Sequence, residues 1–140
     1  MSPRLLLVDD AEDIRTIARI SLERVGDWTV VPVASGQEAL QAAERDGPFD
    51  AVLLDVMMPG MDGPSTLQAL RGAGLLVGVP IVFLTAKAQS AELGRLLALG
   101  AAGVIAKPFD PLTLSDELKQ LLDDRRSVYN NCTHSSRSSE

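Results

Sequence analysis

Short apolar runs alternate along this chain with longer segments in which apolar residues recur at helical spacing. Three of the runs, at residues 5–8, 51–54 and 81–84, are apolar throughout, as expected for strands that are buried on both faces. Strands that alternate with helices in this way form a parallel sheet with right-handed crossovers. The pattern therefore predicts an α/β fold, a doubly wound five-stranded parallel sheet with helices on both faces.

The expected strands and helices follow one another as five βα units. The strands are expected at residues 4–8, 29–33, 51–54, 81–84 and 104–106. The helices are expected around residues 14–25, 37–45, 64–70, 90–99 and 114–122. In the first helix five apolar residues share one face, and we expect that face to cover the sheet. They are Ile14, Ile17, Ala18, Leu22 and Val25.

The length of 140 residues and the hydrophobic share of 46% fit one globular domain. We expect this domain to span residues 1–126 and to stand alone, without an output domain. From residue 127 to residue 140 serines and asparagines replace the apolar residues that a core would need. This composition predicts a disordered Ser-rich tail.

The net charge, the longest apolar stretch and the single cysteine limit the partners and the cellular location that we expect for this chain. The net charge of −6 does not fit direct binding to nucleic acid. The longest apolar stretch, residues 75–86, is broken by Gly78 and Pro80 and is too short for a membrane span, so we expect no membrane insertion. Cys132 is the single cysteine, so no disulfide can form within the chain, and we expect a reducing, cytoplasmic location.

Five polar residues stand where the apolar strand patterns end. They are Asp9 and Asp10 after the first strand, Asp55 after the third, Thr85 after the fourth and Lys107 after the fifth. The carboxyl ends of parallel strands meet at one edge of the sheet, which is where ligands bind in this class of fold. We therefore expect these five side chains to lie together.

The residue types in this set point to phosphoryl chemistry. Three crowded carboxylates repel one another unless a cation neutralises them, and oxygen ligands without His or Cys favour Mg²⁺. Lys107 and Thr85 can then bind phosphoryl oxygens, and Asp55 is the best candidate nucleophile. The alternative is that Asp55 only forms a turn before the segment MMPG.

At these residues the sequence resembles the receiver-domain family of two-component response regulators, over residues 4–124. The motifs that carry the resemblance are LLLVDD for the acidic pair, LLDVMMPGMDG for the phosphoacceptor Asp55, IVFLTA for the hydroxyl residue Thr85 and AKPF for Lys107. The resemblance implies a flavodoxin-like sheet of order 2-1-3-4-5. It also implies a signalling switch with intrinsic phosphotransfer and autodephosphorylation rather than an enzyme.

The resemblance further implies how the site works. Asp10, Asp55 and the Met57 backbone carbonyl would bind Mg²⁺ directly, with Asp9 helping through water. The Lys107-Pro108 bond would be cis. The phosphodonor would be the phosphohistidine of a sensor histidine kinase or a histidine phosphotransfer protein. An acyl phosphate on Asp55 would then change binding to an unknown downstream protein, through the surface of the fourth helix, the fifth strand and the last helix.

The sequence departs from the family pattern at Val104, where many receivers carry the Tyr or Phe that moves inward on activation. Gly94, inside the fourth expected helix, has two interpretations: it loosens the helix, or it allows close packing. Met57 and Lys87 hold the two variable positions, two residues after Asp55 and Thr85, that tune the lifetime of the phosphoryl group in this family.

Two other functions use the same residues differently. A Mg²⁺-dependent phosphohydrolase of the haloacid-dehalogenase kind also has an Asp nucleophile, but it normally carries a second acid two residues later, where this chain has Met57. A pseudo-receiver would bind partners with its acidic cluster idle. The complete set of five polar residues argues against the pseudo-receiver.

Overall fold

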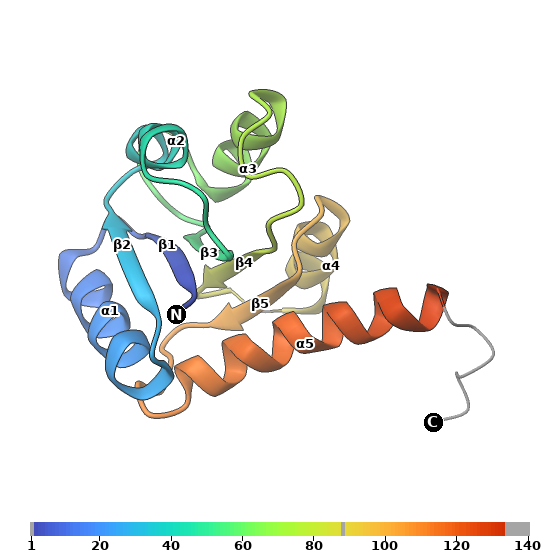
Figure 1. Ribbon diagram of the computed structural model, residues 1–140. Helices are drawn as coiled ribbons and strands as arrows, with labels where there is room; N and C mark the ends of the chain where they lie inside the picture. Colours follow the sequence, from blue (N-terminus) through green and yellow to red (C-terminus); the bar gives the residue numbers. More distant parts are fainter. Residues whose placement is uncertain (1, 88, 134–140) are drawn as a thin grey trace.

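The structure is a computed structural model that describes residues 2–87 and 89–133, with side chains described as far as Asp123 (Figure 1). Five strands form one sheet in the order β2-β1-β3-β4-β5, and every neighbouring pair is parallel. The strands are β1 (Arg4–Val8), β2 (Thr29–Val33), β3 (Ala51–Asp55), β4 (Ile81–Thr85) and β5 (Gly103–Ala106). The predicted strand order is confirmed.

The helices cover both faces of the sheet. They are α1 (Glu12–Gly26), α2 (Gly36–Arg45), α3 (Gly63–Gly72), α4 (Ser90–Ala98) and α5 (Leu114–Thr133). Figure 1 shows α1 and α5 on one face and α2, α3 and α4 on the other. The fold is therefore the predicted doubly wound, flavodoxin-like α/β fold. None of the described helices has both the length and the apolar character of a membrane span.

The core lies in two layers because successive side chains of a strand point to opposite faces. Leu5 and Leu7 of β1 pack in the layer under α1 and α5, whereas Leu6 and Val8 pack in the layer under α2, α3 and α4. Every residue of β3 and of β4 is buried. The continuous apolar runs in the sequence are thus the strands that are covered on both faces.

Helix α1 buries only part of the predicted face: Ala18 and Leu22 are buried, and Ile14 packs against the core. Ile17 and Val25, which we expected to cover the sheet, are 44% and 49% exposed. The residues that α1 buries are Ala18, Ser21, Leu22 and Gly26. The reason is the close approach of α5, since a Cβ on Gly26 would collide with Ser115. The buried stripe turns toward this contact, and Ile17 and Val25 are left on the surface.

Helix α5 extends past the predicted domain boundary. We expected the folded domain to end at residue 126, but the helical backbone continues to Thr133. No Gly or Pro interrupts the sequence from Leu114 to Thr133, so nothing in the chain forces the helix to end earlier. The remainder of the predicted tail, residues 134–140, lies outside the described residues.

Hydrogen bonds at the start of α3 hold the loop that connects β3 to α3. The Asp62 carboxylate accepts a hydrogen bond from the Ser65 amide at 2.9 Å and caps the helix. The Gly63 amide donates to the Val56 carbonyl at 2.8 Å. A Cβ on Gly63 would lie only 2.5 Å from the backbone oxygen of Asp55, so α3 can approach the end of β3 this closely only with glycine at that position.

Candidate functional site

The five predicted site residues come from strand ends at one edge of the sheet. Asp9 and Asp10 directly follow β1, and Lys107 directly follows β5. Asp55 and Thr85 are the last residues of β3 and β4, so each ends its strand instead of following it as predicted. The ladder pairs Asp55 with Leu84, and Lys107 donates its amide proton to the Thr85 carbonyl at 2.7 Å.

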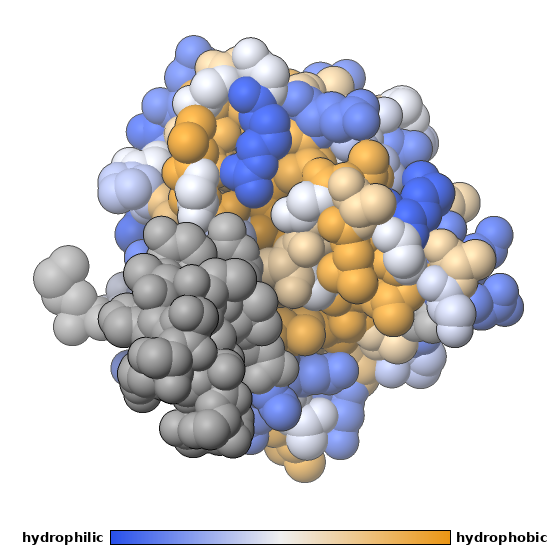
Figure 2. Space-filling view, turned by 90° about the vertical axis from the view of Figure 1, so that its right-hand side faces the viewer, coloured by the Kyte–Doolittle hydropathy of each residue, from blue (hydrophilic) through white to orange (hydrophobic). Residues whose placement is uncertain are grey.

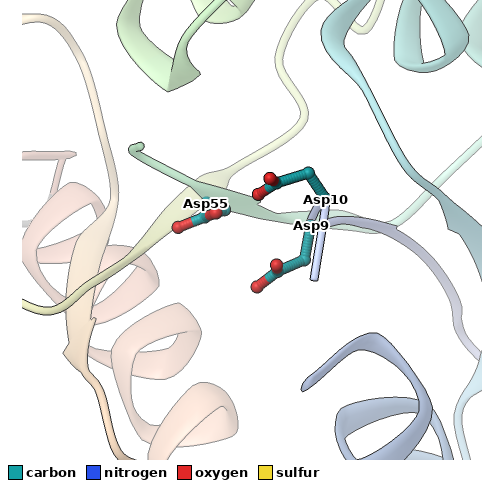
Figure 3. Close-up of side chains that lie close together, drawn as sticks. All are labelled: Asp9, Asp10 and Asp55. Atoms are coloured by element: carbon teal, nitrogen blue, oxygen red, sulfur yellow. The ribbon is translucent and has the colours of Figure 1, made fainter. Parts of the chain in front are cut away.

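Three carboxylates converge at this edge. Figure 3 shows the side chains of Asp9 and Asp10, at the end of β1, and of Asp55, on β3, with their carboxylates projecting to the same side. One oxygen from each carboxylate lies within 4.8 Å of the others. Asp9 and Asp55 are buried and Asp10 is exposed. The predicted acidic cluster is therefore formed, with one side open to solvent.

Lys107 bridges two of the three carboxylates. Its Nζ lies 3.1 Å from Asp55 Oδ1, to which it donates a hydrogen bond, and 3.1 Å from Asp9 Oδ2. The peptide bond between Lys107 and Pro108 is cis, as the family resemblance implied. The lysine ammonium thus lies against the acidic cluster.

Hydrogen bonds fix one carboxylate oxygen and the backbone carbonyl of Asp9. Its Oδ1 accepts from the Ala11 amide at 2.9 Å, and its backbone carbonyl accepts from Arg15 Nη1 at 2.7 Å. Its Oδ2 is buried and, although close to the Lys107 ammonium, makes no hydrogen bond of acceptable geometry. Arg15 was not among the predicted site residues, because nothing in the sequence distinguishes it from the other arginines of its helix.

Burial and neighbouring charges shift the pKa values of Asp55 and Lys107. Burial, together with the negative charge of Asp9, raises the pKa of Asp55 to about 6 although Lys107 acts in the opposite direction. Burial alone would lower the pKa of Lys107, but its contacts with Asp9 and Asp55 more than offset this and raise the pKa. The lysine therefore stays protonated, and the Asp55 carboxylate is destabilised in the absence of a further cation.

The cluster fits a divalent, oxygen-preferring cation. Three carboxylates against one ammonium leave two negative charges uncompensated when all are ionised. The buried Oδ2 of Asp9 has Lys107 Nζ as its ion-pair partner at 3.1 Å but makes no hydrogen bond of acceptable geometry, so it keeps lone pairs that a cation can bind. Because the ligand atoms of the described cluster are all carboxylate oxygens, a hard cation suits it better than a transition metal.

Two predicted site residues remain: Thr85, which ends β4, and Met57, which lies two residues after Asp55 in the chain. Thr85 is buried, and its hydroxyl oxygen accepts a hydrogen bond from the Lys87 amide at 3.0 Å. Met57 is 65% exposed and lines a cavity of about 390 Å³ with Met58, Pro59 and Asp62. The role of the Met57 carbonyl as a metal ligand stays a prediction.

The raised pKa of Asp55 predicts a pH dependence of stability when divalent cations are chelated. The folded pKa of about 6 lies above the value of about 3.9 for an unfolded Asp, so the folded state binds this proton more tightly. Asp55 therefore contributes stability at low pH, and this contribution is lost as the pH rises through 6. In urea denaturation, we expect the free energy of unfolding to be about 1 kcal/mol higher at about pH 5 than at about pH 7.5 because of this residue.

The control for this measurement is Asp55→Asn, which removes the titrating group and keeps its shape. The variant is expected to lack the part of the pH dependence that Asp55 causes. Equal pH dependence in wild type and variant would contradict the assignment.

Comparison with known proteins identifies the class that this fold and site define. A family profile described as the response regulator receiver domain matches residues 5–119. The match spans most of the chain, and the chain belongs to this family. Receiver domains are phosphoryl-accepting signalling domains, and the arrangement of acids and lysine at the sheet edge agrees with that class.

Individual relatives support the same assignment. The alkaline phosphatase synthesis transcriptional regulatory protein PhoP of Bacillus subtilis is 39% identical over 127 residues, which cover 91% of this chain and 50% of that protein. The probable transcriptional regulator ycf27 of Porphyridium aerugineum is 37% identical over 134 residues, covering 94% of this chain and 54% of the regulator. The chain thus spans about half the length of these relatives, and our expectation of a stand-alone receiver stays a prediction.

Solved structures show the same fold over nearly their whole length. The chemotaxis protein CheY4 of Vibrio cholerae superposes with a TM-score of 0.79 at 33% identity, covering 86% of this chain and 99% of CheY4. A putative response regulator from Chloroflexus aurantiacus gives a TM-score of 0.77 at 32% identity, covering 88% of this chain and 99% of that one.

Proposed function

We propose that this chain is a phosphorylatable switch whose phosphoacceptor is Asp55. The observation that carries the proposal is the convergence of the Asp9, Asp10 and Asp55 carboxylates with the Lys107 ammonium at the carboxyl edge of the sheet. The proposed donor is the phosphohistidine of a sensor histidine kinase or a histidine phosphotransfer protein. The proposal places the chain in the cytoplasm, where such kinases use ATP.

In the proposed reaction, a carboxylate oxygen of Asp55 attacks the phosphorus of the donor. The donor is a phosphohistidine protonated on its other ring nitrogen. The bond between phosphorus and the imidazole nitrogen breaks as the new bond to the Asp55 oxygen forms, so that neutral imidazole leaves and an acyl phosphate remains. Lys107 is already within 3.1 Å of Asp55 and stabilises charge on the transferred oxygens. The buried hydroxyl of Thr85 can donate a hydrogen bond to a second oxygen.

The proposed metal is Mg²⁺, held by Asp10, Asp55 and the Met57 carbonyl, with Asp9 assisting through water. When bound, it supplies the positive charge that offsets the crowded carboxylates and the charge on the phosphoryl oxygens. The Ala11 amide holds Oδ1 of Asp9 and the Arg15 guanidinium holds its backbone carbonyl, which leaves Oδ2 beside Lys107 at the site.

The proposed donor docks on the apolar surface of α1 and the loop between β5 and α5. Ile17 and Ile20 are 44% and 42% exposed, and Leu112 in the loop is 75% exposed. The Ser21 hydroxyl donates to the Pro111 carbonyl, so the loop is attached to the same part of α1. Large exposed apolar side chains that gather on one surface favour a protein partner.

The proposed output surface is formed by α4, β5 and α5. Figure 2 shows apolar surface on the side of the molecule that includes α4. Leu97 of α4 is 43% exposed, and Val104 of β5 is partly exposed where many receivers have an aromatic residue. A downstream protein that binds this surface would sense changes in the position of α4.

Phosphorylation by a small-molecule donor tests the proposal. Acetyl phosphate with Mg²⁺ is expected to add the mass of one phosphoryl group to the wild-type chain in intact-mass spectrometry. Chelation of Mg²⁺ should prevent the reaction, and hydroxylamine, which cleaves acyl phosphates, should remove the group. A modification that forms without Mg²⁺ or resists hydroxylamine would contradict the aspartyl phosphate.

Two further measurements separate the rival functions from the proposed one. A phosphohydrolase of the haloacid-dehalogenase kind would release phosphate from ordinary phosphoesters over many turnovers. A pseudo-receiver would take up no phosphoryl group and would not respond to Mg²⁺ with beryllofluoride, which mimics the phosphoryl group. We expect neither result, because Met57 replaces the second acid of the hydrolases and the acidic cluster with its lysine is complete.

A further inference from the structure

One peptide unit joins the two acids that follow β1. Asp9 and Asp10 come directly after the strand, and Figure 3 shows both side chains at this strand end. Because a peptide unit is planar, the direction of the Asp9 carbonyl changes together with ψ of Asp9 and φ of Asp10. A group that holds this carbonyl therefore restricts both torsion angles, and with them the directions in which the two carboxylates leave the backbone.

The group that holds the carbonyl is the guanidinium of Arg15, near the start of α1. Its Nη1 donates to the Asp9 carbonyl at 2.7 Å, a length typical of a hydrogen bond with a charged donor. The backbone amide of Arg15 donates to the Ala11 carbonyl at 2.9 Å, so its own backbone is fixed in the first turn. The side chain thus ties the helix to the peptide unit between the two acids, six residues back in the chain.

The two acids differ in how much else holds them. The Asp9 amide donates to the Val33 carbonyl at 3.2 Å, and Asp9 Oδ1 accepts from the Ala11 amide at 2.9 Å. Asp9 is also buried, whereas Asp10 is exposed, so packing does little to fix the Asp10 carboxylate. The backbone that precedes Asp10 therefore matters more for the direction of its side chain than it does for Asp9.

The arginine one turn further along α1 makes a different contact. Arg19 pairs with Glu23 at 3.2 Å, and the two side chains are 38% and 37% exposed. Ion pairs of this kind on the surface contribute little to stability. Arg15 and Arg19 thus carry the same charge on the same helix, but the contact of Arg15 is with the backbone of the acidic cluster.

We propose that Arg15 is a positioning residue of the metal site: by holding the Asp9 carbonyl, it keeps Asp9 and Asp10 in the orientation that binds Mg²⁺. This inference rests on the proposed function, in which Asp10 is a direct ligand of Mg²⁺. The positive charge of Arg15 acts in the opposite direction, because it repels a cation at the site. Loss of Arg15 therefore weakens Mg²⁺ binding if the hydrogen bond decides, and strengthens Mg²⁺ binding if the charge decides.

Titration of the full chain with Mg²⁺, followed by amide chemical shifts in NMR, tests the proposal. Arg15→Met keeps the apolar stem and removes both the donor and the charge. We expect it to raise the Kd for Mg²⁺ about tenfold, at the lower end of the range typical for residues that orient a metal ligand. The matched control Arg19→Met makes the same change one turn along the helix and should bind Mg²⁺ like the wild type. Arg15→Gln makes the same test with a shorter side chain, should Arg15→Met fail to fold.

Phosphorylation by acetyl phosphate at increasing Mg²⁺ gives a second readout that general damage to the fold would not produce. In Arg15→Met, the Mg²⁺ concentration for half-maximal labelling should rise about tenfold, in step with the Kd. The rate at saturating Mg²⁺ should stay within about twofold of the wild type, because the hydrogen bond of Arg15 goes to Asp9 and not to the phosphoacceptor.

Three results would overturn the role of Arg15. They are unchanged or tighter Mg²⁺ binding in Arg15→Met, an equal loss of binding in Arg19→Met, and a slow rate at saturating Mg²⁺ with an unchanged Kd. Each of these leaves the proposed function intact, because the wild type still binds Mg²⁺ and is labelled. If the wild type itself binds no Mg²⁺, the proposed function fails and the role of Arg15 fails with it.

Discussion

The variant Asp55→Asn is expected to take up no phosphoryl group from acetyl phosphate under conditions in which the wild type is fully labelled. An amide oxygen is a poor nucleophile, and an Asn has no negative charge to bind Mg²⁺. Intact-mass spectrometry measures the labelled fraction directly. We also expect the variant to be more stable than the wild type in chelator at neutral pH, because the pKa of about 6 shows that the Asp55 carboxylate is unfavourable in the fold.

Asp62→Asn is the control for this result. It makes the same chemical change seven residues further along the chain, and Asn caps a helix about as well as Asp. The control should be labelled like the wild type. Full labelling of Asp55→Asn, or loss of labelling in Asp62→Asn alone, would assign the phosphoacceptor to another residue.

Gly63→Ala is expected to lower the free energy of unfolding by about 3 kcal/mol. This value is at the upper end of the range of roughly 1–3 kcal/mol that is typical when a buried site is overpacked. The new Cβ would lie 2.5 Å from the Asp55 oxygen and 2.9 Å from the Val56 Cα, and both are backbone atoms that cannot rotate away. Because the end of β3 has to move, phosphorylation of Asp55 should slow as well. Urea denaturation and the labelling assay measure the two effects.

The comparison variant for Gly63→Ala is Gly72→Ala, at the other end of α3. It adds the same methyl group where no described residue outside the helix's own backbone lies within 4 Å, so we expect it to be neutral or to stabilise the chain by about 0.5–1 kcal/mol. If both variants have the same stability, α3 does not pack against β3 as closely as described.

The sequence predicted the strands well because they are buried on both faces. The run from Ala51 to Leu54 has no polar residue, and in the structure every residue of β3 is buried, including Asp55. The exposed Ile17 of α1 was predicted wrongly, because helical spacing shows which residues share a face but not where a second helix will pack. The contact of Gly26 with α5 decides this, and it joins residues far apart in the chain.

The site could be predicted as a set of residues but not as a geometry. Strand ends place Asp9, Asp55 and Lys107 at one edge, which is enough to expect that they meet. The sequence does not reveal that Lys107 lies 3.1 Å from both carboxylates, that one oxygen of Asp9 has no hydrogen bond, or that Arg15 holds the Asp9 backbone carbonyl. The openness around Gly94 likewise depends on packing in three dimensions.

The uncompensated charge of the carboxylate cluster also links folding to the ionic composition of the solution. A cation that binds the folded chain and not the unfolded one adds RT ln(1 + [L]/Kd) to the free energy of unfolding, where [L] is its free concentration. The melting temperature of this domain should therefore rise with free Mg²⁺, and a preparation kept in EDTA is the least stable form of the molecule. Through mass action, the acids that we propose to hold Mg²⁺ would also make the stability of the fold depend on the concentration of free divalent metal.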